Sequence, residues 1–174
     1  MGLILKQIFS LLKLLNSDTG HNQISAGVAA GFILGMTPTF SLQTLLVYLL
    51  LFVFRVQVGA VFLTAFFFSF MAYLLDPVFH SVGYSILKAD GLQGFFTLLY
   101  NMPIIPFTRF NNTIVMGSGV VAFVLSPVVF IIARALIIRY RVSIVEKFKE
   151  SKFWKAVKAT GFYKWYLKYE DLYG

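Results

Sequence analysis

The 174-residue chain is expected to fold as an all-α polytopic membrane protein, and three features of its sequence support this. Hydrophobic residues make up 59% of the chain and charged residues 13%, whereas soluble domains are about 45–50% apolar and about 25% charged. Stretches free of Asp, Glu, Lys and Arg are long enough for spanning helices, which need about 20 residues. Polar, proline-containing breaks interrupt two segments. We therefore predict two full spans plus two broken or re-entrant helical hairpins, with a possible inverted repeat.

A single integral membrane domain over residues 1–174 is expected, because short connections join the apolar segments. Its parts are an interfacial amphipathic helix over 1–18, a membrane core over 22–138 and a basic cytoplasmic tail over 139–174. The chain has no cysteine and two histidines, so thiolate sites are excluded and neither a metal nor another cofactor is expected.

The N-terminal segment places apolar residues at helical spacing on one side and Lys6, Ser10 and Lys13 on the other. This pattern predicts a helix lying in the membrane interface, and the alternative is a helix packed against the protein's own core. The segment lacks the charge and cleavage pattern of a removable signal peptide.

The apolar run from Ile24 to Phe54 is too long for one simple span and too short for two. The sequence Thr37-Pro38-Thr39 divides it, since proline removes a backbone donor and disfavours helix in the preceding residue. Nearby hydroxyls and Gln43 can satisfy the freed groups, which predicts a broken hairpin; a single kinked helix is the alternative. The glycines at 27, 31 and 35 form a strip suited to close helix contact.

Residues Val58–Leu75 form the clearest span, which we expect to end at Asp76-Pro77. Asp76 either marks the interface or faces a polar interior and pairs with a cation. His80 follows Asp76 by one helical turn, so the two side chains can share a face. They could relay protons, although an ordinary interfacial hydrogen bond is the favoured interpretation.

A second interrupted segment, Leu92–Thr113, contains Pro103 and Pro106 and ends in a polar cluster with Arg109, Asn111 and Asn112. As at Pro38, a proline is followed by polar residues before an apolar helix resumes. Two such interruptions in corresponding halves of a chain indicate an inverted-repeat core with a site near the bilayer midplane. The shared pattern is only a few residues long, so chance is the competing explanation. We predict a substrate or lipid site formed by Thr37, Pro38, Gln43, Asp76, His80, Arg109, Asn111 and Asn112.

The last predicted span, Ile114–Ile138, carries Arg134 near its basic end, where arginine can snorkel to headgroups or enter a polar interior. The tail beyond it holds most of the net charge of +8, which predicts cytoplasmic N- and C-termini and an even number of crossings. Basic residues interleaved with aromatics favour anionic headgroups here, and nucleic acid is not expected. The predicted membrane-surface residues are Lys147, Lys149, Lys152, Trp154, Lys155 and Lys158.

Four stretches resemble an uncharacterised family of small bacterial inner-membrane proteins: Leu15–Thr19, Gly31–Pro38, Tyr73–His80 and Pro106–Thr113. That family is similar to a wider domain-of-unknown-function group marked by a glycine-rich helix followed by proline. The resemblance implies one half of a two-gene pair whose other half is a longer membrane-anchored envelope protein. The layout also resembles that of DedA-type membrane proteins, although layout does not decide function.

We therefore expect a non-catalytic, multi-pass inner-membrane subunit of a bacterial envelope complex that supports lipid transport or lipid homeostasis with a larger membrane-anchored partner. The alternative is an independent proton-coupled secondary transporter of a small solute or lipid, using Asp76 with His80 or Arg109. No nucleophile, paired-carboxylate or metal pattern supports an enzyme.

Overall fold

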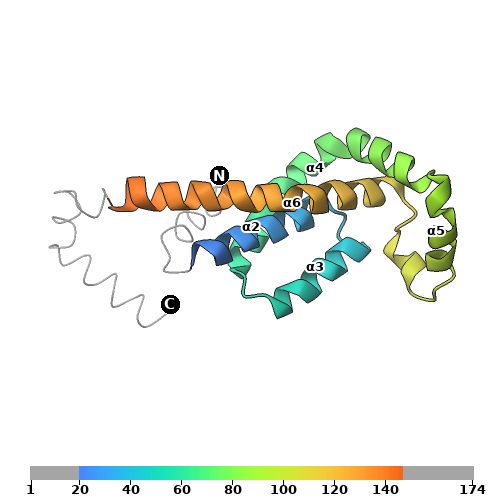
Figure 1. The fold of residues 1–174 in the computed structure, drawn as a ribbon, viewed down its shortest axis with the longest axis horizontal. Helices are drawn as coiled ribbons and strands as arrows, with labels where there is room; N and C mark the ends of the chain where they lie inside the picture. The colour runs from blue at the N-terminus through green and yellow to red at the C-terminus, as the bar shows by residue number, and fades with distance from the viewer. Residues whose placement is uncertain (1–19, 147–174) are drawn as a thin grey trace. The chain divides into compact units, whose positions relative to one another are not determined.

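The structure, a computed structural model, describes residues 20–146, and the regular elements in this range are all helical (Figure 1). The expected interfacial helix over 1–18 lies outside the described residues. So do the predicted membrane-surface residues Lys147, Lys149, Lys152, Trp154, Lys155 and Lys158.

The described chain forms five α-helices joined by short connections. They are α2 (His21–Met36), α3 (Leu42–Val53), α4 (Val58–Leu87), α5 (Gln93–Tyr100) and α6 (Thr113–Tyr140), with the short turns η1 (Asp90–Leu92), η2 (Ile105–Thr108) and η3 (Arg141–Glu146). The chain divides into a first unit, Met1–Ala135, and a second unit, Leu136–Gly174. Everything described below belongs to the first unit unless stated otherwise.

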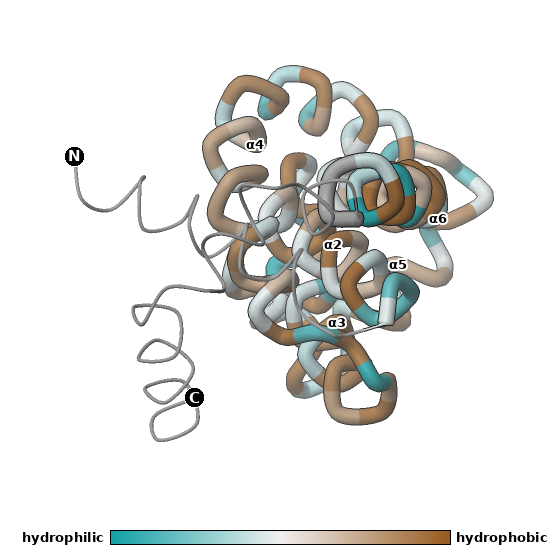
Figure 2. Tube along the Cα trace, turned by 90° about the vertical axis from the view of Figure 1, so that its left-hand side faces the viewer, coloured by the Kyte–Doolittle hydropathy of each residue, from teal (hydrophilic) through white to brown (hydrophobic). Residues whose placement is uncertain are grey.

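Among the described residues, two helical segments are long and apolar enough to cross a bilayer: Val58–Leu87, and α6 with its continuation to Ser143. Only 17% and 11% of their most apolar windows are buried, whereas the core helices of soluble domains are mostly buried. Figure 2 shows the apolar residues that run along α4 and α6. Because large contiguous apolar surfaces are rare on soluble monomers, the two helices support association with a membrane.

The predicted break at Pro38 separates two helices and does not merely kink one. The helix α2 ends at Met36 and α3 begins at Leu42, and Figure 1 shows α3 turning back along α2. Ser41 caps α3 by accepting a hydrogen bond from the Thr44 backbone N–H at 3.2 Å. At the other side, the Thr37 hydroxyl donates to the Ile33 carbonyl at 2.8 Å.

The predicted glycine strip of α2 packs directly on α4. A Cβ built at Gly27 would lie 2.6 Å from the Gln57 carbonyl oxygen, and one at Gly35 would lie 2.7 Å from the Ala65 carbonyl oxygen. Gly31 faces the Val61 carbonyl in the same way. The small residues therefore let the two backbones touch, as the four-residue spacing indicates.

The core of the first unit gathers side chains from α2, α3, α4 and α6. Its buried members are Phe32, Ile33, Met36, Val47, Phe79 and Ala122. Phe32 also meets Phe68 of α4 edge to face, with ring centroids 4.9 Å apart. This core holds the broken hairpin against the two long helices.

The prediction that the span Val58–Leu75 ends at Asp76-Pro77 is wrong, because α4 continues without interruption to Leu87. A proline inside a helix removes one backbone hydrogen bond, a loss that tertiary packing can offset. Phe79 and Gly83 are buried just beyond Pro77, and Ala72 and Leu75 just before it pack against the core, so packing continues on either side of the proline. Pro127 lies inside α6 in the same manner, and the Ser126 hydroxyl donates at 2.9 Å to the Phe123 carbonyl that Pro127 leaves without its usual donor.

Candidate polar site at the first helix break

The break between α2 and α3 contains a compact network of hydroxyl groups. The Thr44 hydroxyl donates to the Pro38 carbonyl at 3.0 Å and accepts from the Ser41 hydroxyl at 3.1 Å. It also lies 3.1 Å from the Thr37 hydroxyl. Thr37, Ser41 and Thr44 are buried, so this network satisfies the backbone groups that the helix ends and Pro38 leave open.

Asp76 of α4 faces this break. It lines a cavity of about 270 Å³ together with Thr37, Pro38 and Thr39. The carboxylate is half-buried and forms no ion pair within the described residues. Ser69 and Tyr73 line the same cavity and were not among the predicted site residues, although positions seven and three residues before Asp76 fall on its helix face.

Arg109 and Asn112 approach the break from the segment that precedes α6. They line a neighbouring cavity of about 420 Å³ with Pro38, Thr39 and Phe40. Arg109 has a φ of 56°, a left-handed conformation that non-glycine residues adopt mainly in turns and functional sites. Asn112 caps α6, because its side-chain oxygen accepts from the backbone N–H groups of Ile114 at 2.9 Å and Val115 at 3.2 Å.

The two cavities share Pro38, Thr39 and Ile114. The break therefore has a carboxylate on one side and a guanidinium on the other, with an uncharged hydroxyl network between them. Asp76 and Arg109 form no ion pair with each other, and each lines its own cavity. Four predicted site residues, Thr37, Pro38, Asp76 and Arg109, thus surround one place, and Asn112 joins them.

Gln43 extends to α6 and does not line either cavity. Its amide nitrogen donates to the Val115 carbonyl at 3.4 Å, and the absence of a side chain at Gly119 gives the amide room. The Gln43 side-chain oxygen is buried with no hydrogen-bond partner within the described residues. The residue therefore connects α3 to α6 next to the break.

The remaining two predicted residues lie elsewhere. The His80 Nδ1 atom is 2.7 Å from the Thr113 hydroxyl, so His80 pairs with the start of α6 and not with Asp76. Asn111 lines a separate hollow of about 330 Å³ with Gln93, Tyr100 and Phe110. No group of three or more His, Asp or Glu side chains in the described part of the chain is arranged to hold a metal ion.

Over residues 20–146 the regular elements are all helical, with two helices apolar enough to span a membrane and a polar helix break packed beside them. Residues 7–144 match the family described as "Uncharacterized protein conserved in bacteria (DUF2062)", and the chain belongs to this family. An uncharacterized protein of Treponema pallidum (strain Nichols) is 26% identical over 144 residues, which cover 83% of this chain and 89% of the relative. No solved structure matches the chain. The expected membership in an uncharacterised bacterial family is thus confirmed.

Proposed function

We propose that the protein is a non-catalytic inner-membrane subunit of a bacterial envelope complex that supports lipid transport or lipid homeostasis with a larger membrane-anchored partner. In this proposal α4 and α6 cross the bilayer, the interrupted segments enter it as re-entrant hairpins, and both termini are cytoplasmic. The break at Pro38 is the place where a lipid headgroup or a partner helix binds.

The exposed apolar faces of the two long helices support the embedded arrangement. Side chains such as Phe70 on α4 and Val124 on α6 are 61% and 68% exposed. Exposed apolar area on this scale is unfavourable in water at about 25 cal/mol per Å², and hydrocarbon removes that cost. A broken backbone beside these helices is tolerated because the hydroxyl network and neighbouring helices surround it.

The single observation that carries the proposal is the convergence of Asp76, Arg109 and Asn112 on the two sides of Pro38. A guanidinium group binds phosphate through paired hydrogen bonds, and a carboxylate binds an ammonium group. A zwitterionic phospholipid headgroup carries both charges. The arrangement of charges around the break is therefore suited to such a headgroup, or to a partner segment that carries one acidic and one basic residue.

The test is mild-detergent purification from bacterial membranes, followed by mass spectrometry of the bound proteins and lipids. Wild-type protein should retain a larger membrane-anchored protein and phospholipid, and Asp76→Asn and Arg109→Gln should lower both. Asp90→Asn, which removes the same charge in the exposed turn η1, is the matched control. Recovery of wild-type protein alone and free of lipid would contradict the proposal.

A second candidate is a proton-coupled transporter, and the observation that favours it is the half-buried Asp76, which lines a cavity and has no ion pair within residues 20–146. Intramembrane carboxylates of this kind serve as proton carriers in transporters. In this case Asp76→Asn should abolish pH-dependent solute uptake into vesicles, whereas Asp90→Asn should not. Unchanged uptake with Asp76→Asn would exclude this candidate and leave the subunit proposal intact.

A further inference from the structure

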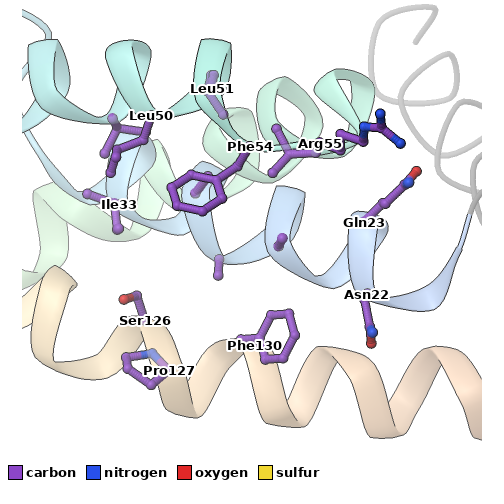
Figure 3. Close-up of a pocket in the computed structure, with 15 residues that line it drawn as sticks. Asn22, Gln23, Ile33, Leu50, Leu51, Phe54, Arg55, Ser126, Pro127 and Phe130 are labelled. Atoms are coloured by element: carbon purple, nitrogen blue, oxygen red, sulfur yellow. The ribbon is translucent and has the colours of Figure 1, made fainter.

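A separate groove lies at the opposite end of α2 from the Pro38 break. It has a volume of about 480 Å³ and is bounded by α2, by α3 with the connection that follows it, and by α6 (Figure 3). This volume is within the range of about 300–1,000 Å³ that is typical of small-molecule sites. None of the side chains that line it belongs to the Pro38 site.

The groove exists because the two faces of α2 carry different small residues. Glycines 27, 31 and 35 bring one face against α4, while Ala26, Ala29 and Ala30 face the groove. Alanine side chains end at Cβ and cannot fill the space toward α3 and α6. Larger apolar side chains, Leu50, Leu51, Phe54 and Phe130, form the opposite walls. The result is an elongated apolar channel along α2.

One end of the groove is polar and cationic. Asn22, Gln23 and Arg55 lie there, and Figure 3 shows Gln23 and Arg55 together at the first turn of α2. A backbone hydrogen bond of 3.1 Å from the Gln57 N–H to the Gln23 carbonyl holds the start of α4 beside this turn. Arg55 therefore stays close to the end of the groove, where it is exposed and makes no ion pair within residues 20–143.

A second guanidinium group reaches the same turn. The Arg134 Nε atom of α6 donates to the Asn22 side-chain oxygen at 2.8 Å. This hydrogen bond uses the Asn22 side-chain oxygen as acceptor, so the NH₂ group is the part of the amide that can donate to a ligand. The first turn of α2 contains no acidic residue, and the helix dipole places a partial positive charge at this end. The residues that line the groove include no Asp or Glu.

We propose that this groove binds one anionic phospholipid, with its phosphate at Arg55, Asn22 and Arg134 and an acyl chain along the alanine face of α2. Charge complementarity selects the occupant, because two guanidinium groups, in a groove whose described lining has no carboxylate, favour a headgroup with a net negative charge. A zwitterionic lipid would add its own ammonium group to this cationic end and bind less well. The inference rests on the membrane insertion in the proposed function, but not on the Pro38 site.

The test measures retained lipid by native mass spectrometry after the full chain is extracted from nanodiscs of phosphatidylcholine, with or without phosphatidylglycerol. Wild-type protein should retain one phosphatidylglycerol that phosphatidylcholine does not replace, in addition to any phosphatidylcholine held at the Pro38 break. Arg55→Gln should weaken phosphatidylglycerol binding about tenfold, as expected for a lost hydrogen bond to a charged group. Lys88→Gln removes the same charge at the far end of α4 and should leave binding unchanged.

Ala26→Phe tests the apolar part of the groove independently, because its ring would occupy the channel while the cationic end stays intact. Phosphatidylglycerol retention should fall in this variant also, with an unchanged circular dichroism spectrum. Wild-type retention in both Arg55→Gln and Ala26→Phe would overturn the inference. Replacement of this phosphatidylglycerol by phosphatidylcholine at equal concentration, or photo-crosslinking of residue 26 to a protein instead of lipid, would overturn it as well.

The same variants separate this inference from the proposed function. Arg109→Gln should leave phosphatidylglycerol retention unchanged, because Arg109 lines the other site. Loss of the protein partner in Arg109→Gln with normal phosphatidylglycerol retention supports both assignments. Loss of phosphatidylglycerol retention in Arg109→Gln but not in Arg55→Gln would overturn the groove assignment alone.

Discussion

Gly83 of α4 and Gly117 of α6 face each other where the two long helices meet. A Cβ at Gly83 would overlap the Thr113 carbonyl, and a Cβ at Gly117 would overlap the Phe79 carbonyl. The backbones are therefore in direct contact, and the contact is reciprocal. Thr113 also meets His80 at this place, so the crossing sets where the polar segment before α6 is held relative to α4.

The first prediction concerns this crossing. Gly117→Ala should destabilise the protein by about 1–3 kcal/mol, because neither backbone can move aside without disturbing the packed core. Thermal unfolding in detergent, followed by far-UV circular dichroism, measures the change. Gly94→Ala is the control: its Cβ meets open space on α5, so it should stabilise slightly. Equal unfolding temperatures for Gly117→Ala and wild type would show that the helices do not touch here.

The second prediction concerns the hydroxyl network. Thr44→Val keeps the side-chain shape but leaves the Pro38 carbonyl without this hydroxyl donor and the buried Ser41 hydroxyl without its acceptor, so it should cost about 1–3 kcal/mol. Thr97→Val, which removes an exposed hydroxyl bonded to the Gln93 carbonyl, should change stability by under about 0.5 kcal/mol. The same unfolding measurement compares them. A loss no larger for Thr44→Val than for Thr97→Val would contradict the network.

The third prediction concerns the proline in α6. Ser126→Ala should destabilise the wild-type background, because the Phe123 carbonyl then loses the hydroxyl that replaces its usual donor. In a Pro127→Ala background the backbone N–H returns, so Ser126→Ala should have little effect there. A double-mutant cycle should give a coupling of at least about 0.5 kcal/mol. Additive effects would mean that the serine does not compensate for the proline.

The fourth prediction tests the environment of the long helices. The chain has no cysteine, so each introduced cysteine reports one position. Met71→Cys on α4 and Val124→Cys on α6, both exposed in the structure, should resist a water-soluble maleimide in intact membranes because hydrocarbon covers them. Asp90→Cys lies between α4 and α5. It should be labelled quickly once the reagent has access to both sides of the membrane. Rapid labelling of all three positions would place α4 and α6 in water.

Local sequence patterns predicted much of the fold. The spacing of Gly27, Gly31 and Gly35 predicted a close helix contact, and the Thr37-Pro38-Thr39 sequence predicted the end of α2. Both features follow from backbone sterics that act within a few residues. The same reasoning failed at Asp76-Pro77, where proline is followed by more helix. Whether one missing hydrogen bond ends a helix depends on packing from other elements, which a local pattern does not contain.

In the candidate site, too, local sequence patterns predicted some features and tertiary packing decided others. The sequence by itself determined which residues are polar within apolar surroundings, because composition and spacing reveal them directly. Only the tertiary structure decided that Asp76 and Arg109 flank one break, that His80 pairs with Thr113, and that Arg55 lines the groove beside Asn22 while Arg134 donates to Asn22. These neighbours are far apart along the chain. Whether such distant residues come together depends on the distances between helices. Those distances are set by the glycine and alanine residues on the packed helix faces, and so by the tertiary structure.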